Sequence, residues 1–119
     1  MSVTVEVAAA YQRGFDHRCE GRYQEAKAEF QRVLSAVPDH ADARWQMALI
    51  QGFEGDFDGS LAALKLLVGT TPDHIPARYD LGMTYMMLGM VDEACAEFHQ
   101  VLRRDPEHEN AKRQLQYCS

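Results

Sequence analysis

The chain has 119 residues, of which 46% are apolar and 25% charged, a composition that suits one small globular domain with its own core. Its formal net charge of −6 argues against a nucleic-acid-binding or membrane-binding surface, since both require a basic face. No apolar run reaches the length of a membrane span, and the opening "MSVTVEVAAAY" lacks the basic segment of a secretory signal.

A short motif recurs at a fixed interval along the chain. "PDH" stands at residues 38–40 and 72–74, and "PEH" at residues 106–108, so that the prolines are 34 residues apart. Blocks that begin at Val7, Ala41 and Ile75 superpose in register, with glycine at the same place in each. The register predicts three repeats of one structural unit, at about residues 7–40, 41–74 and 75–108.

Each block is predicted to form two helices, because apolar residues recur at i, i+3, i+4 and i+7. The first helix of each block ends at a glycine, which adopts positive φ without strain. The second helix ends before the proline, which lacks an N–H and clashes with the preceding turn. In chain order, the predicted helices are residues 7–21, 22–37, 41–55, 57–69, 75–89, 91–104 and 109–118.

Two further features concern the packing and ends of these helices. Small residues at Gly14 and Gly82 are predicted to let the paired helices approach closely, facing Ala26 and Ala94. The histidines of the repeated motif, His40, His74 and His108, are interpreted as turn residues just before the next helix. They are expected to lie too far apart to bind one metal ion, and the alternative is a pH-sensitive patch along one edge.

The third block carries a recognisable skeleton. The stretch "YDLGMTYMMLGMVDEACAEFHQVLRRDP" has the G…Y…A…F…P spacing of the tetratricopeptide repeat, and the whole chain from about residue 7 resembles that family. The matching residues are Leu81, Gly82, Tyr85, Gly89, Ala94, Phe98 and Pro106. The chain departs from the family at the fourth residue of each block, where Ala10, Arg44 and Arg78 replace the frequent tryptophan.

The resemblance implies an all-α fold in a single domain of residues 1–119. The expected architecture is an α-α superhelix, a right-handed solenoid of three helix-turn-helix pairs plus a C-terminal capping helix. It also implies that the first helices of the pairs line a concave groove that binds an extended or helical peptide. The predicted partner-binding residues are Tyr11, Phe15, Trp45, Gln46, Leu49, Phe53, Tyr79, Asp80, Met83, Met86 and Met87.

The apolar members of this set, all except Gln46 and Asp80, are expected to form a near-continuous strip, with Asp42, Asp80, Arg18 and Arg113 as a sparse polar rim. Such a strip exceeds what a soluble monomer normally exposes, so something is expected to cover it. The main hypothesis is an apolar or amphipathic peptide or helix from a protein partner. One alternative is a second copy in a homo-oligomer, and another is that the strip belongs to the protein's own core.

The resemblance does not extend to the cations with which some family members hold a C-terminal carboxylate. The corresponding positions here are Tyr11, Phe15, Gln46, Pro76 and Asp80, and none of them is basic. The sequence therefore predicts no affinity for the acidic C-terminal tails of chaperones.

The sequence contains no pattern typical of catalysis or of cofactor binding. His17 and Cys19 are two residues apart, so they point to different sides of a helix and do not predict a nucleophile pair. Cys19, Cys95 and Cys118 are odd in number and far apart, which favours free thiols in a reducing compartment. We therefore expect a cytoplasmic binding module or scaffold that is not an enzyme and has no cofactor or metal.

Overall fold

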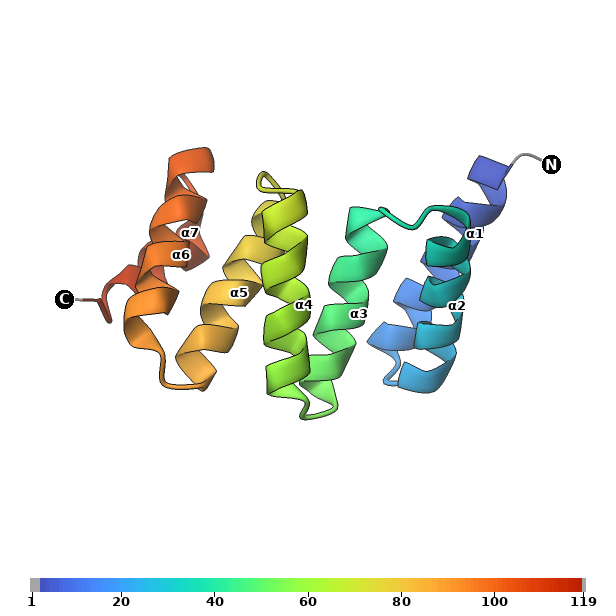
Figure 1. Cartoon of the computed structure of the whole chain (residues 1–119), viewed down its shortest axis with the longest axis horizontal. Coiled ribbons are helices and arrows are strands. Elements are labelled where there is room, and N and C mark those ends of the chain that lie inside the picture. The colour runs from blue at the N-terminus through green and yellow to red at the C-terminus, as the bar shows by residue number, and fades with distance from the viewer. Residues whose placement is uncertain (1–2, 119) are drawn as a thin grey trace. The chain divides into compact units, whose positions relative to one another are not determined.

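The computed structural model describes residues 3–118, and these residues form seven α-helices joined by short turns (Figure 1). The helices are α1 (Val3–Cys19), α2 (Tyr23–Ala36), α3 (Ala41–Phe53), α4 (Phe57–Thr70), α5 (Ile75–Met87), α6 (Val91–Arg104) and α7 (Glu109–Leu115). The predicted all-α class and the order of the helices are confirmed. None of the described helices is long and apolar enough to cross a membrane.

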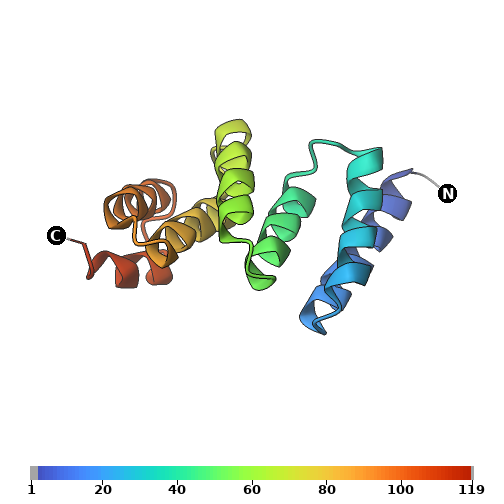
Figure 2. The same cartoon turned by 60° about the horizontal axis from the view of Figure 1, so that its bottom comes forward.

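The chain divides into two compact units, Met1–Asp56 and Phe57–Ser119, which we call the N-terminal and C-terminal units. In the N-terminal unit, α1 and α2 form an antiparallel hairpin, and α3 packs mainly against α2. In the C-terminal unit, α5 and α6 form an equivalent hairpin, α4 packs against α5, and α7 packs against α6 (Figure 2). The unit boundary falls inside the second predicted block, between its two helices.

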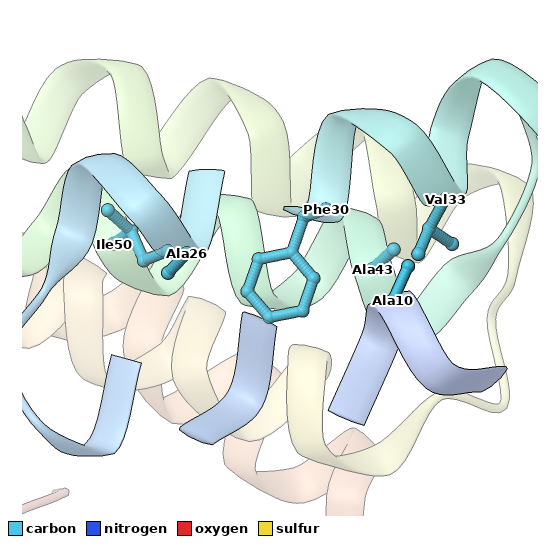
Figure 3. Close-up of a cluster of buried hydrophobic side chains, with 6 residues drawn as sticks. All are labelled: Ala10, Ala26, Phe30, Val33, Ala43 and Ile50. Atoms are coloured by element: carbon cyan, nitrogen blue, oxygen red, sulfur yellow. The ribbon is translucent and has the colours of Figure 1, made fainter. Parts of the chain in front are cut away.

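The core of the N-terminal unit lies where the three helices meet (Figure 3). Its buried members are Ala10, Ala26, Phe30, Val33, Ala43 and Ile50, and all are at most 4% exposed. In the C-terminal unit, the equivalent positions of the repeat are also buried, among them Ala77, Ala94, Phe98, Val101 and Ala111. The buried residues of the two units therefore occupy matching positions of the repeat, on the helix sides that face the neighbouring helices.

Glycine ends the first helix of each block, as predicted. Gly21, Gly55 and Gly89 have φ of +78°, +90° and +78°. The amide of the residue after each glycine donates to a carbonyl five residues earlier, at 2.8, 2.9 and 2.8 Å. This left-handed turn satisfies carbonyls that the helix end would otherwise leave unpaired, and it reverses the chain into the next helix.

Two other glycines allow the hairpin helices to approach closely. A Cβ atom added to Gly14 would lie 2.7 Å from the ring of Phe30, and one added to Gly82 would lie 2.6 Å from the ring of Phe98. The predicted close approach is therefore confirmed. The sequence analysis expected alanines to face these glycines. The side chain that contacts each glycine is instead a buried phenylalanine, which lies four residues after that alanine in the same helix.

Each histidine of the repeated motif caps the helix that follows it. The Nδ1 atom of each ring accepts a hydrogen bond from the backbone amide three residues later. The pairs are Ala43 to His40 at 3.1 Å, Ala77 to His74 at 3.1 Å and Ala111 to His108 at 3.0 Å. The interpretation of these histidines as turn residues just before the next helix is confirmed. The imidazole nitrogen replaces the side-chain oxygen of the usual serine or asparagine cap.

We expect His40→Ala to lower the free energy of unfolding by about 1 kcal/mol, because an amide at the start of α3 loses its acceptor. His40→Asn restores a side-chain acceptor and should remain close to wild type. Urea unfolding of both variants, followed by circular dichroism at 222 nm, measures the difference. Equal loss in the two variants would show that the ring contact of His40 with Tyr11, at 5.5 Å, matters more than the cap.

The prediction of three free thiols is wrong for two of the cysteines. Cys95 on α6 forms a disulfide with Cys118, which follows α7, and their Cα atoms are 6.0 Å apart. Cys19 is free and exposed. The two bonded cysteines are 23 residues apart in sequence and meet because α7 folds back on α6. The predicted cytoplasmic location loses the support that free thiols lent to it.

The fourth residue of the third block explains one departure from the family pattern. Arg78 on α5 is 8% exposed. Its guanidinium donates to the carboxylate of Glu97 on α6 at 2.9 Å and to the carbonyl of Pro72 at 3.1 Å. At the position where many family members pack a tryptophan ring, Arg78 therefore forms an ion pair with Glu97 and a hydrogen bond to the preceding turn.

Candidate functional site

The predicted partner-binding residues of the N-terminal unit come from α1 and α3. Tyr11, Phe15 and Arg18 follow one side of α1, at spacings of four and three residues. Trp45, Leu49 and Phe53 follow one side of α3 at spacings of four. We call these six residues the aromatic face.

Two contacts connect residues of α1 to residues of α3. The amide of Gln46 donates to the hydroxyl of Tyr11 at 3.2 Å, and the guanidinium of Arg18 lies 6.0 Å from the centre of the Phe53 ring. The Phe53 ring also stacks on Tyr23 of α2, at 5.9 Å between ring centres. The two rows therefore run beside each other within one unit.

The aromatic face remains partly open to solvent. Phe15 is 36% exposed and Phe53 is 53% exposed, while Tyr11, Trp45 and Leu49 are half-buried. None of these side chains is sealed beneath the protein's own helices. The face thus combines two exposed phenylalanine rings with a half-buried tryptophan and leucine, which is the residue content of a protein-binding surface.

Gln46 does not belong to the exposed face, although the sequence placed it in the groove. It is 1% exposed and its amide is bonded to Tyr11. Burial is the main cause that raises the pKa of the Tyr11 hydroxyl, and the hydrogen bond from Gln46 opposes that shift. Burial likewise raises the pKa of the Tyr79 hydroxyl, and the nearby Gln114 opposes that shift. Tyr79 and Gln114 hold the same places in the third and fourth blocks as Tyr11 and Gln46 hold in the first and second.

Arg18 lies within the aromatic face and not at its rim. Its guanidinium is 5.2 Å from the centre of the Phe15 ring, in addition to the contact with Phe53. Cation–π attraction to both rings holds it in place. Its Nε atom is buried and has no hydrogen-bond acceptor among residues 3–118.

The predicted residues of the C-terminal unit follow α5. Met87 is 62% exposed, while Tyr79, Asp80, Met83 and Met86 are half-buried. The Tyr79 ring packs against Phe98 at 5.7 Å and against His108 at 5.1 Å, so much of its surface serves the unit's own packing. This surface carries fewer exposed rings than the aromatic face.

One exposed aromatic residue of the C-terminal unit was absent from the predicted set. Tyr117 follows α7 and is 65% exposed. It occupies the ninth place of the incomplete fourth block, the same place as Phe15, Leu49 and Met83 in the first three. Continuing the 34-residue register past residue 108 identifies it.

One hollow of the N-terminal unit lies away from the aromatic face. A cavity of about 380 Å³ between α1 and α2 is lined by small and charged side chains, including Val7, Ala9, Arg13, Arg32 and Ala36. It contains none of the predicted partner-binding residues. Within residues 3–118, no group of three histidine, cysteine or acidic side chains is placed to hold a metal ion.

Comparison with known proteins places this geometry in context. Two family profiles, both described as tetratricopeptide repeat, match residues 7–40 and 54–116. A search of curated proteins found no match.

Three solved structures illustrate the likeness. The first tetratricopeptide repeat domain of Spaghetti (RPAP3), bound to the HSP90 peptide SRMEEVD, has a TM-score of 0.86 and 19% identity, over 93% of this chain and 90% of that one. The second such domain of human RPAP3, in complex with the HSP70 peptide SGPTIEEVD, has a TM-score of 0.81 and 19% identity, over 95% of this chain and 94% of that one. An O-GlcNAc transferase of Thermobaculum terrenum has a TM-score of 0.85 and 21% identity, over 100% of this chain and 24% of that one. At these identities the likeness is one of fold.

Proposed function

Because the chain belongs to the tetratricopeptide repeat family, we propose that it binds a protein partner through the aromatic face of its N-terminal unit. The observation that carries this proposal is that Phe15 and Phe53, which share the guanidinium of Arg18, are exposed, and that Trp45 and Leu49 on the same side of α3 are only half-buried. Exposed apolar side chains that lie together lower the free energy when a partner covers them. The partner is an apolar or amphipathic peptide or helix, and the chain acts by binding, without catalysis.

Two comparisons support a peptide ligand but not the same ligand. Both RPAP3 domains are similar in fold to this chain and hold chaperone-derived peptides that end in acidic residues. Tyr11, Phe15, Gln46, Pro76 and Asp80 correspond to the positions where some family members hold a terminal carboxylate, and none of these five residues is basic. The proposed ligand is therefore distinguished by its apolar side chains.

The test is truncation of Trp45. We expect Trp45→Ala to weaken the binding of a partner by about 2 kcal/mol, roughly thirtyfold in Kd, because a central tryptophan loses its contact area. The partner is first identified by affinity capture and mass spectrometry, and Kd is then measured by isothermal titration calorimetry with purified partner. Leu66→Ala is the matched control, since Leu66 lies outside the aromatic face on α4 and is 61% exposed.

Two outcomes would contradict the proposal. In the first, Trp45→Ala binds the partner as tightly as the wild type does. In the second, Leu66→Ala weakens binding as much as Trp45→Ala does. The peptide SRMEEVD serves as the control ligand, and we expect no measurable heat of binding from it. The alternative of self-association is separated by sedimentation velocity, because a homo-oligomer dissociates on dilution while a monomer keeps its sedimentation coefficient.

A further inference from the structure

Arg18 differs from the other cations near it in having no carboxylate partner. In the N-terminal unit, Arg13 pairs with Glu29 at 3.0 Å and Lys27 pairs with Glu54 at 3.0 Å. Within residues 3–118, Arg18 forms neither an ion pair nor a side-chain hydrogen bond, although acidic residues outnumber basic ones in the chain by 18 to 12. An unpaired cation in an acidic protein is available to an acidic group from outside.

The surroundings of Arg18 strengthen any such contact. Its guanidinium lies over the Phe15 ring and near the Phe53 ring, at 5.2 and 6.0 Å, and these rings offer no oxygen acceptors to its N–H groups. The side chain is partly buried, so water screens its charge less than it screens a fully exposed arginine. The planar guanidinium can bind both oxygens of a carboxylate in one plane, which adds direction to the attraction.

We infer that Arg18 binds a carboxylate of the partner, so that the partner segment carries an aspartate or glutamate side chain beside the apolar residues that cover Phe15 and Phe53. This inference rests on the proposed function of the aromatic face and specifies its ligand. The carboxylate is a single one. One guanidinium binds one carboxylate as a bidentate pair.

The experiment uses a ligand that can be made without knowing the natural partner. A random dodecapeptide library displayed on phage is selected against the intact protein, and bound phage that still bind Trp45→Ala are removed. Selected sequences are synthesised with amidated C-termini, so that only side-chain carboxylates remain. Trp45 is the single tryptophan of the chain and lies on the face, so its fluorescence reports binding to the wild type.

The decisive comparison changes the peptide and leaves the protein intact. We expect the selected peptides to carry one acidic residue at a fixed distance from their apolar residues. Replacing that residue by glutamine should weaken binding to the wild type about tenfold. Arg18→Gln should bind both peptides with the weaker affinity, and Arg18→Lys should keep part of the preference because it keeps the charge without the planar fork.

Each other outcome has a defined meaning. If Trp45-dependent peptides are selected but the acidic and glutamine forms bind equally, the inference about Arg18 is wrong and the binding face stands. If the acidic preference persists in Arg18→Gln, another cation binds the carboxylate and the inference is again wrong. If no peptide depends on Trp45, the proposed function fails and the inference fails with it.

Discussion

Replacement of Arg78 by methionine is expected to lower the free energy of unfolding by about 3 kcal/mol, because it leaves the carboxylate of Glu97 without its partner. The side chains of Arg78 and Glu97 are only 10% and 20% exposed, and their atoms are 2.9 Å apart. Methionine fills a similar length but cannot compensate the charge or bond the Pro72 carbonyl. Chemical unfolding, with the urea dependence checked for an unchanged slope, measures the loss.

A second substitution separates charge from packing. Arg78→Met combined with Glu97→Gln removes the uncompensated charge, so the double variant should recover part of the lost stability. The control is Lys112→Met, whose pair with Glu107 is 42% and 85% exposed and should therefore contribute far less to stability. A double variant no more stable than Arg78→Met would show that the loss comes from packing or the Pro72 bond.

Gly82→Ala is expected to lower the free energy of unfolding by about 3 kcal/mol, although alanine favours helix more than glycine does. The added Cβ would lie 2.6 Å from the ring of Phe98, and that ring is fully buried and cannot move aside. The helices must therefore separate or the ring must leave its rotamer. Thermal or urea unfolding of the variant measures the effect.

The chain supplies both a control and a rescue for this prediction. Gly69 lies on α4 with nothing within 4 Å of an added Cβ, so Gly69→Ala should stabilise the protein by about 0.5 kcal/mol. The second block has Ala48 and Leu64 at the places of Gly82 and Phe98. Gly82→Ala combined with Phe98→Leu should accordingly be more stable than Gly82→Ala alone. Opposite signs for the two alanine variants are the critical result.

Much of the fold could be predicted because its signals are local in the sequence. The helical spacing of apolar residues, the glycine that ends each first helix and the proline after each second helix act on neighbouring residues. Each signal occurs three times at a spacing of 34 residues, and the predicted helix bounds therefore agree with the observed ones within a few residues. The start of α1 at Val3, before the predicted residue 7, is the largest shift.

The candidate site was predicted in part. Helical spacing correctly placed Phe15, Leu49 and Phe53 where they keep exposed surface, since position along a helix determines its side. Spacing does not determine which side chain is covered by a neighbour. Gln46 is buried because the Tyr11 hydroxyl of the previous block lies against it, and Arg18 leaves the rim because two rings attract it.

The sequence by itself determined the repeat, the helices, their ends and the family, because helices and their ends depend on residues that are close together in the chain and the repeat copies these local signals at a fixed spacing of 34 residues. The tertiary structure alone decided the Cys95–Cys118 disulfide, the Arg78–Glu97 pair and the position of Arg18 between Phe15 and Phe53. The disulfide, the Arg78–Glu97 pair and the contact of Arg18 with Phe53 each join residues about 20 or more positions apart on different elements. Which of them meet depends on how the helices pack, and periodicity within one helix carries no information about that.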